Sequence, residues 1–145
     1  MATYPRHKKA KLIRDYMIES NTVKMFKEEE KDDCIFFRTL YPMSGDKKQV
    51  VLTINDTVYV GLQILLTQQV PVEKVDKVLT MLNAFNLELP TVKYVLTKDQ
   101  CIVVSMFFPA DEKHFHAPMI MGATIQVLKN VAEKHYGIIK EIMEK

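Results

Sequence analysis

Residues 48–68 read KQVVLTINDTVYVGLQILLTQ, and this stretch decides the fold. It contains two strand-like runs, Lys48 to Asn55 and Thr57 to Gln68, which are rich in Val, Ile, Leu, Tyr and Thr. The Asn55-Asp56 pair between them favours a turn, because both residue types adopt turn conformations at little cost. The stretch therefore predicts a β-hairpin.

The segments around this hairpin predict four further strands and three helices. The additional strands are expected at Val23 to Lys27, Cys34 to Tyr41, Thr91 to Thr97 and Gln100 to Phe108. Helical spacing of apolar residues covers Lys8 to Ser20, Val75 to Asn86 after Pro71, and Glu112 to Lys145, with Asp111 as the expected N-cap and Pro118 expected to delay or kink the start. The order α-β-β-β-β-α-β-β-α predicts an α+β fold, in which helices pack on an antiparallel sheet within one domain, residues 1–145.

The composition is that of an ordinary globular protein. The 145 residues are 48% apolar and 26% charged, with a net charge of +2. The basic run Arg6 to Arg14 and the acidic run Glu28 to Asp33 are interpreted as solvated segments, and neither indicates a nucleic-acid surface. No apolar stretch is long enough for a membrane span, so we expect a cytoplasmic protein in which Cys34 and Cys101 are reduced core thiols.

The sequence contains no recognisable catalytic or metal-binding motif. With four glycines it has no Gly-rich phosphate loop and no nucleophile elbow. His114 and His116 are two residues apart, a spacing that points the rings to opposite sides of a helix and does not favour a shared metal. We therefore expect no catalytic residue, no cofactor and no enzymatic activity.

Several predicted strands are apolar on both faces, which indicates that both faces of the sheet are covered. Ile35 to Phe37 and Ile102 to Val104 are examples, and a single layer of helices would leave one face of such strands in water. The first helix, a second copy of the chain or a partner segment could cover that face, and a symmetric homodimer is the commonest arrangement. Strand alternation places four candidate partner-binding residues on it: Val51, Tyr59, Gln63 and Leu65.

The segment from Val75 to the C-terminus resembles the YbjN-like family of bacterial proteins, which are described as sensory transduction regulators. The resemblance is carried by Leu82-Asn83-Ala84-Phe85-Asn86, Leu89-Pro90, the strand Val92 to Leu96, Asp99 and the strand Ile102 to Pro109. It implies a fold similar to that of type III secretion chaperones, which bind extended client segments and are often dimers. The slightly basic chain differs from those chaperones, which are typically acidic.

The leading hypothesis is a dimeric, non-enzymatic binding or regulatory module that recognises a protein segment by a sheet face or edge. The alternative is a small-molecule sensor with a pocket between the sheet and the last helix, where Met121, Ile125 and Leu128 would form one wall. Met119 to Met121 is the best candidate for an exposed, methionine-rich patch. An enzyme is the third hypothesis, and it would require a pocket of convergent polar groups.

Overall fold

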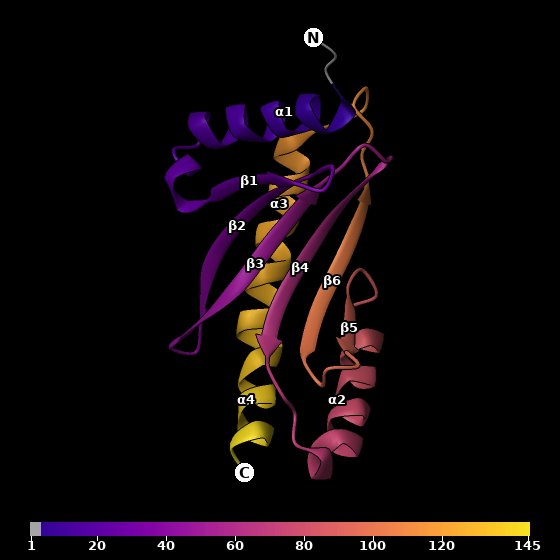
Figure 1. Ribbon diagram of the computed structural model, residues 1–145. Helices are drawn as coiled ribbons and strands as arrows, with labels where there is room; N and C mark the ends of the chain where they lie inside the picture. Colours follow the sequence, from indigo (N-terminus) through magenta and orange to yellow (C-terminus); the bar gives the residue numbers. More distant parts are fainter. Residues whose placement is uncertain (1–3) are drawn as a thin grey trace. The chain divides into compact units, whose positions relative to one another are not determined.

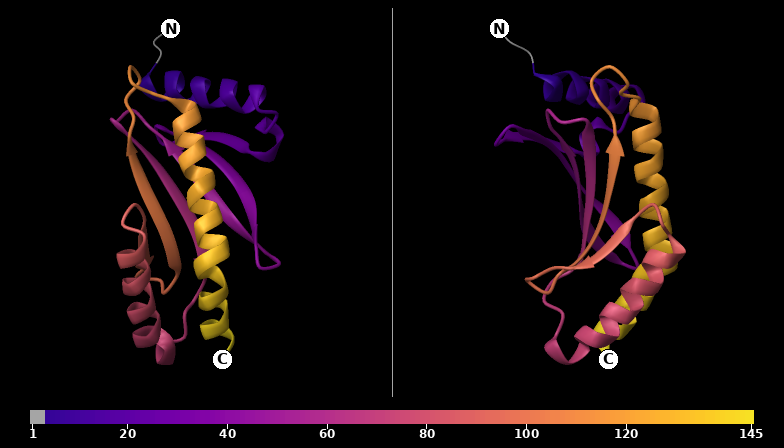
Figure 2. Two further views of the ribbon diagram at one scale, coloured as in Figure 1. Left: turned by 180° about the vertical axis from the view of Figure 1, so that it is seen from behind. Right: turned by 90° about the vertical axis from the view of Figure 1, so that its right-hand side faces the viewer.

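The computed structural model describes residues 4–145, which form an α+β fold with a six-stranded antiparallel sheet (Figure 1). The strands are β1 (Lys27–Lys31), β2 (Cys34–Met43), β3 (Asp46–Ile54), β4 (Tyr59–Thr67), β5 (Lys93–Leu96) and β6 (Ile102–Pro109), in the sheet order β1-β2-β3-β4-β6-β5. The helices are α1 (Pro5–Glu19), α2 (Val75–Glu88), α3 (Ala117–Asn130) and α4 (Tyr136–Glu144). A π-helical segment, Val131–His135, joins α3 to α4 without a loop, as Figure 2 shows. Short 3-10 turns lie at Val23–Met25 and Val72–Lys74.

The predicted fold class and element order are confirmed, but the first strand was predicted at the wrong residues. Val23–Met25 is a 3-10 turn, and β1 is the charged run Lys27–Lys31. A two-residue turn aligns this run with β2, because Asp32 and Asp33 adopt positive φ angles of 53° and 62°. The acidic run therefore contains an edge strand as well as a turn.

The C-terminal helix begins later than predicted, and Asp111 is not its N-cap. The helix starts at Ala117, which puts Pro118 in the first turn, where its missing N–H costs little. The Nδ1 atom of His116 accepts a hydrogen bond from the backbone N–H of Met119 at 3.2 Å, as a capping side chain does. The carboxylate of Asp111 instead accepts from the backbone N–H of His114 at 2.7 Å, within the preceding loop.

The chain forms two compact units. Unit 1 comprises residues 4–39, 51–62 and 107–125, and unit 2 comprises residues 40–50, 63–106 and 126–145. Each unit has buried apolar residues from both helices and strands. In unit 1 they include Ala10, Ile13 and Met17 of α1 and Ile35, Phe37, Leu52, Ile54, Val60 and Leu62 of the strands. In unit 2 they include Val78, Leu82 and Phe85 of α2, Ile64, Leu66, Ile102 and Val104 of the strands, and Ile139 of α4.

A buried hydrogen-bonded cluster ties the π-helical segment of unit 2 to α2 and β5. The Tyr94 hydroxyl hydrogen-bonds to Nδ1 of His135 at 2.6 Å, and Nε2 of His135 donates to the Glu88 carboxylate at 3.2 Å, since a carboxylate only accepts. The ring of Phe85 stacks on His135, with the two ring centroids 4.0 Å apart. Burial raises the pKa of Tyr94, so its hydroxyl stays protonated within this cluster.

The edge strand β5 has part of its backbone blocked by α2. The side-chain amide of Asn86 accepts a hydrogen bond from the Tyr94 N–H at 2.6 Å and donates to the Tyr94 carbonyl at 3.1 Å. Figure 1 shows α2 lying beside β5. Asn86 therefore occupies the backbone groups that an added strand would use, a protection that edge strands commonly need.

We predict that Asn86→Ala lowers the free energy of unfolding by about 1–3 kcal/mol, because it leaves both backbone groups of Tyr94 without this partner. Asn86→Asp keeps the acceptor and should cost less. Urea unfolding measures these differences. Asn83→Ala is the matched control, since Asn83 is exposed on the same helix. Equal losses for Asn83→Ala and Asn86→Ala would contradict the assigned role.

Candidate functional site

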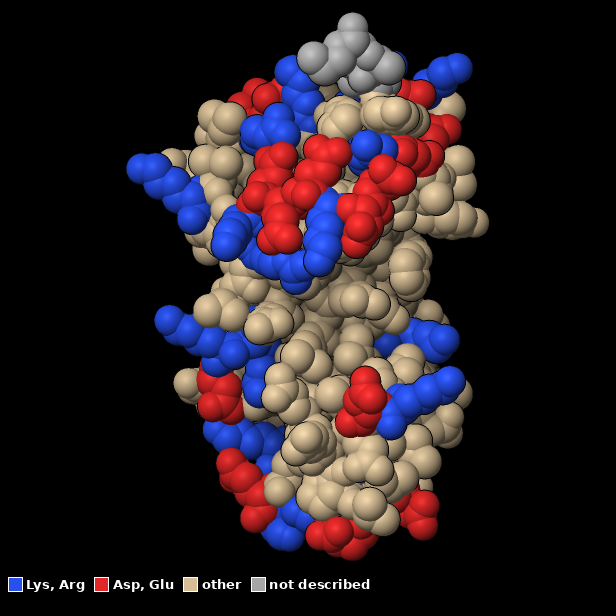
Figure 3. All heavy atoms as spheres, viewed as in Figure 1, with Lys and Arg blue, Asp and Glu red and all other residues tan. Residues whose placement is uncertain are grey.

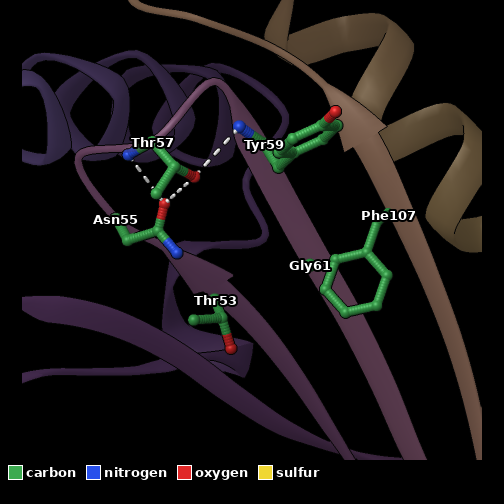
Figure 4. Close-up of a pocket in the computed structure, with 6 residues that line it drawn as sticks. All are labelled: Thr53, Asn55, Thr57, Tyr59, Gly61 and Phe107. Atoms are coloured by element: carbon green, nitrogen blue, oxygen red, sulfur yellow. Dashed lines mark hydrogen bonds between the residues drawn. The ribbon is translucent and has the colours of Figure 1, made fainter.

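Along the strands, residues alternate between a buried side and a more exposed side, and the sheet face with the more exposed side chains is here called the open face. A hollow of about 410 Å³ lies on the open face in unit 1. Figure 4 shows the residues that line this aromatic hollow: Thr53, Asn55, Thr57, Tyr59, Gly61 and Phe107. They come from β3, the β3–β4 turn, β4 and β6. Tyr59 is 51% exposed and Phe107 is 64% exposed, so two aromatic rings are presented to solvent.

Gly61, which is buried, lines the aromatic hollow without a side chain. The ring of Phe107 lies against it, and a Cβ atom added at Gly61 would come within 3.0 Å of Cε1 of Phe107 (Figure 4). A glycine inside a strand often marks a close approach by another group, and here that group is a ring from β6. The position of the Phe107 ring therefore depends on the missing side chain.

Hydrogen bonds within the β3–β4 turn fix the polar rim of the aromatic hollow. The side-chain carbonyl oxygen of Asn55 accepts from the backbone N–H of Thr57 at 3.0 Å and from its hydroxyl at 2.5 Å. The Thr57 hydroxyl oxygen in turn accepts from the backbone N–H of Tyr59 at 3.2 Å. This Asx-type turn sets the start of β4 and hence the position of Tyr59 (Figure 4).

Helix α1 holds the same turn from the other side with two buried cations. Arg6 donates to the carboxylate of Asp56 through its backbone N–H at 3.0 Å and through Nη1 at 2.6 Å. The ammonium of Lys9 donates to the Thr57 carbonyl at 2.5 Å, and burial lowers the pKa of this lysine. Residues early in the chain thus position the rim of the aromatic hollow.

Electrostatic pairing between α1 and β1 reinforces this arrangement. The Arg6 guanidinium and the His7 ring hydrogen-bond to Glu30 and hold the pKa of its carboxyl below the usual value. Burial raises the pKa of Asp56, but the hydrogen bonds from the Arg6 backbone and side chain outweigh it, so the pKa is lowered overall. Figure 3 shows acidic and basic side chains interleaved over α1 and β1.

The structure places the four sequence-predicted residues on two separate parts of the open face. Tyr59 lines the aromatic hollow of unit 1, and Val51 is partly exposed in the same unit. Gln63 is exposed and Leu65 is partly exposed in unit 2, where Leu65 lines a different, polar hollow. On β4, Tyr59, Gln63 and Leu65 are less buried than Val60, Leu62 and Ile64, and the partner-binding role of the predicted residues stays a prediction.

Sequence reasoning missed Gly61 and Phe107 as site residues. Gly61 stood out as a glycine within a strand pattern, and that signal alone could have suggested close approach of another group. Phe107 belongs to the apolar run of β6, and the sequence alone does not show which strand pairs with β6. Their proximity follows from the pairing order, in which β6 lies next to β4.

The residues predicted to line a small-molecule pocket differ in burial, and so do those predicted to form a methionine-rich patch. Met121 and Leu128 are buried, whereas Ile125 is 50% exposed, so only two of the three are buried as the wall of an internal pocket would be. Met119 is exposed, but Ile120 and Met121 are buried, so the predicted patch is reduced to one methionine. Met119, Ile120 and Met121 are consecutive residues of α3, so their side chains point to different sides of the helix.

The remaining candidate groups stay apart in the described structure. Cys34 is the first residue of β2 and Cys101 directly precedes β6, and both are free but partly exposed, so they are not the core thiols that were predicted. His114 is a surface residue whose Nδ1 lies 2.9 Å from the carboxylate of Asp111. Within residues 4–145, no three His, Cys, Asp or Glu side chains gather as metal ligands, and no helix is long and apolar enough to cross a membrane.

The aromatic hollow offers apolar rings and neutral polar groups. Its six lining residues supply aromatic, hydroxyl and amide groups, which suit contact with an apolar group and hydrogen bonding to neutral polar groups. Comparison of the chain with protein-family models and with curated proteins found no match. These comparisons indicate no function, so the chemistry of the aromatic hollow is the observation from which a function can be proposed.

We predict that Arg6→Gln lowers the free energy of unfolding at neutral pH and flattens its dependence on acid pH. The folded-state pKa values of Glu30 and Asp56 are lowered, so their contribution is present above the unfolded values of about 4 and is lost as pH falls through the folded values. Urea unfolding between about pH 2 and pH 7 tests this. Arg14→Gln, which removes a more exposed pair with Glu28, is the control and should change both quantities less. An equal change in both variants would contradict the account.

Proposed function

We propose that this protein is a non-enzymatic binding module that recognises an extended segment of a partner protein on the open face of unit 1. The single observation that carries the proposal is the aromatic hollow, which presents the exposed rings of Tyr59 and Phe107, with the Phe107 ring lying against Gly61. An apolar side chain placed there would remove the surfaces of Tyr59 and Phe107 from water. Burial of apolar surface is the main favourable contribution to most protein–protein association.

Polar groups beside the rings support an extended peptide as the occupant. The hydroxyls of Thr53 and Tyr59 have no hydrogen-bond partner within residues 4–145. An extended segment carries one N–H and one carbonyl per residue, and these groups need partners when they leave water. The two hydroxyls could supply such partners while the aromatic hollow takes a side chain.

Features of both edge strands favour the face over an edge as the binding surface. Addition of a strand to an edge needs a row of free backbone groups. On β5, the amide of Asn86 already occupies both backbone groups of Tyr94. On β1, all five residues of Lys27–Lys31 are charged and exposed, a composition that discourages edge pairing.

We also propose that the chain is related to the YbjN-like family, which it resembles, and that it forms a homodimer. A chaperone-like fold would suit a module that holds an extended client segment without changing it chemically. Association of two copies is supported by exposed apolar side chains outside the aromatic hollow, such as Leu40, Val72 and Leu87. Sedimentation velocity over a range of protein concentrations tests this part of the proposal, and a monomer throughout would reject it.

We predict that a library of random phage-displayed peptides, selected on the wild-type protein, yields sequences that share an apolar residue. Gly61→Ala should weaken binding of these peptides by about tenfold or more, because its Cβ narrows the aromatic hollow and displaces the Phe107 ring. The change in folding stability should stay within about 1 kcal/mol, since the Cβ meets only the end of an exposed side chain. Tyr59→Asp should weaken binding similarly.

Gly122→Ala is the matched control for the peptide experiment. Gly122 lies within α3, and a Cβ added there meets nothing within 4 Å. This variant should gain roughly 0.5–1 kcal/mol of stability and keep wild-type peptide affinity. The proposal is wrong if selected peptides bind Gly61→Ala and Tyr59→Asp as tightly as wild type, or if selection yields no common apolar residue.

A further inference from the structure

A second hollow, of about 340 Å³, lies in unit 2 and differs in chemistry from the aromatic hollow. Its lining residues come from the start of β3, the end of β4 and the residue that follows β4: Lys47, Lys48, Gln49, Leu65, Leu66, Thr67 and Gln68. Two lysines, two primary amides and one hydroxyl belong to this set, and it contains no carboxylate. The polar hollow therefore carries net positive charge and many hydrogen-bond donors.

The two lysines of the polar hollow differ in how they are held. The Lys48 ammonium lies 4.8 Å from the centroid of the Tyr136 ring, a cation–π distance. The nearby Asp46 carboxylate accepts from the Tyr136 hydroxyl at 2.7 Å and pairs with Lys140 at 3.2 Å. Lys47 has no carboxylate partner within residues 4–145, so its charge is available to a ligand.

Three neutral side chains of the polar hollow also lack internal partners. The amides of Gln49 and Gln68 make no hydrogen bond to any described residue. The Thr67 hydroxyl oxygen is buried and has no hydrogen-bond partner in the described structure. Buried polar groups are nearly always paired, so an unpaired hydroxyl beneath a surface hollow is the kind of exception that a bound ligand explains.

We propose that the polar hollow binds an oxyanion, either a carboxylate or a phosphate group. Lys47 neutralises its charge, the amides of Gln49 and Gln68 donate hydrogen bonds to its oxygens, and rotation of the Thr67 side chain brings its buried hydroxyl to the anion as a further donor. Such an anion has several acceptor sites, which matches a lining set that is rich in donors and contains no carboxylate. This site is separate from the aromatic hollow, and neither proposal depends on the other.

Chemical-shift titration of the isotope-labelled protein with sodium acetate and, separately, with inorganic phosphate tests the proposal at constant ionic strength. At least one anion should saturate and shift the amide signals of Lys47, Gln49, Thr67 and Gln68. Lys47→Gln and Thr67→Val should each weaken that binding by about tenfold or more, as expected for loss of a hydrogen bond to a charged group. The arm that saturates identifies the carboxylate or the phosphate as the ligand.

A stability measurement separates a binding role of Thr67 from a structural one. Valine replaces the unpaired hydroxyl with a methyl group of similar size, so Thr67→Val should keep or raise the melting temperature while it weakens anion binding. Lys24→Gln, which removes an exposed lysine of unit 1, is the charge control and should bind as wild type. The proposal fails if neither anion saturates, if Lys24→Gln weakens binding equally, or if Thr67→Val binds as wild type.

Discussion

The attachment of α1 to the β3–β4 turn is the constraint on which the aromatic hollow depends. Arg6 and Lys9 are buried cations, and a buried charge is tolerated only where it is paired and hydrogen-bonded. Both find their oxygens on this turn, in the Asp56 carboxylate and the Thr57 carbonyl. If the turn moved, both cations would lose those partners, so the turn that carries the rim of the aromatic hollow is held in place.

Through the β3–β4 turn, side chains of α1 help to position residues on the open face. The turn that is fixed from one side by α1 is fixed on the other side by the Asn55 side chain, and together they set the first residue of β4. Tyr59 is therefore presented by a rigid element, while the missing side chain of Gly61 lets the Phe107 ring lie against the strand. A preformed hollow of this kind limits the entropy lost when a segment binds.

The sequence predicted most of the fold because its strands and helices have clear periodicity. The hairpin around Asn55-Asp56 and the order of the elements followed from apolar alternation and turn residues. β1 was misplaced because its five residues are all charged, so strand propensity gives no signal and only pairing with β2 defines it. For the site, alternation along β4 singled out Tyr59 as a candidate, but Gly61 and Phe107 meet through pairing between strands far apart in the sequence.

The most direct test of the central claim is a map of where a selected peptide contacts the protein. Chemical-shift changes in the labelled protein, followed by intermolecular nuclear Overhauser effects, would provide that map. The account predicts that Tyr59, Gly61 and Phe107 show the largest shifts and direct contacts with an apolar side chain of the peptide. Contacts concentrated instead on the edge strands, Lys27–Lys31 or Lys93–Leu96, would contradict recognition by the open face.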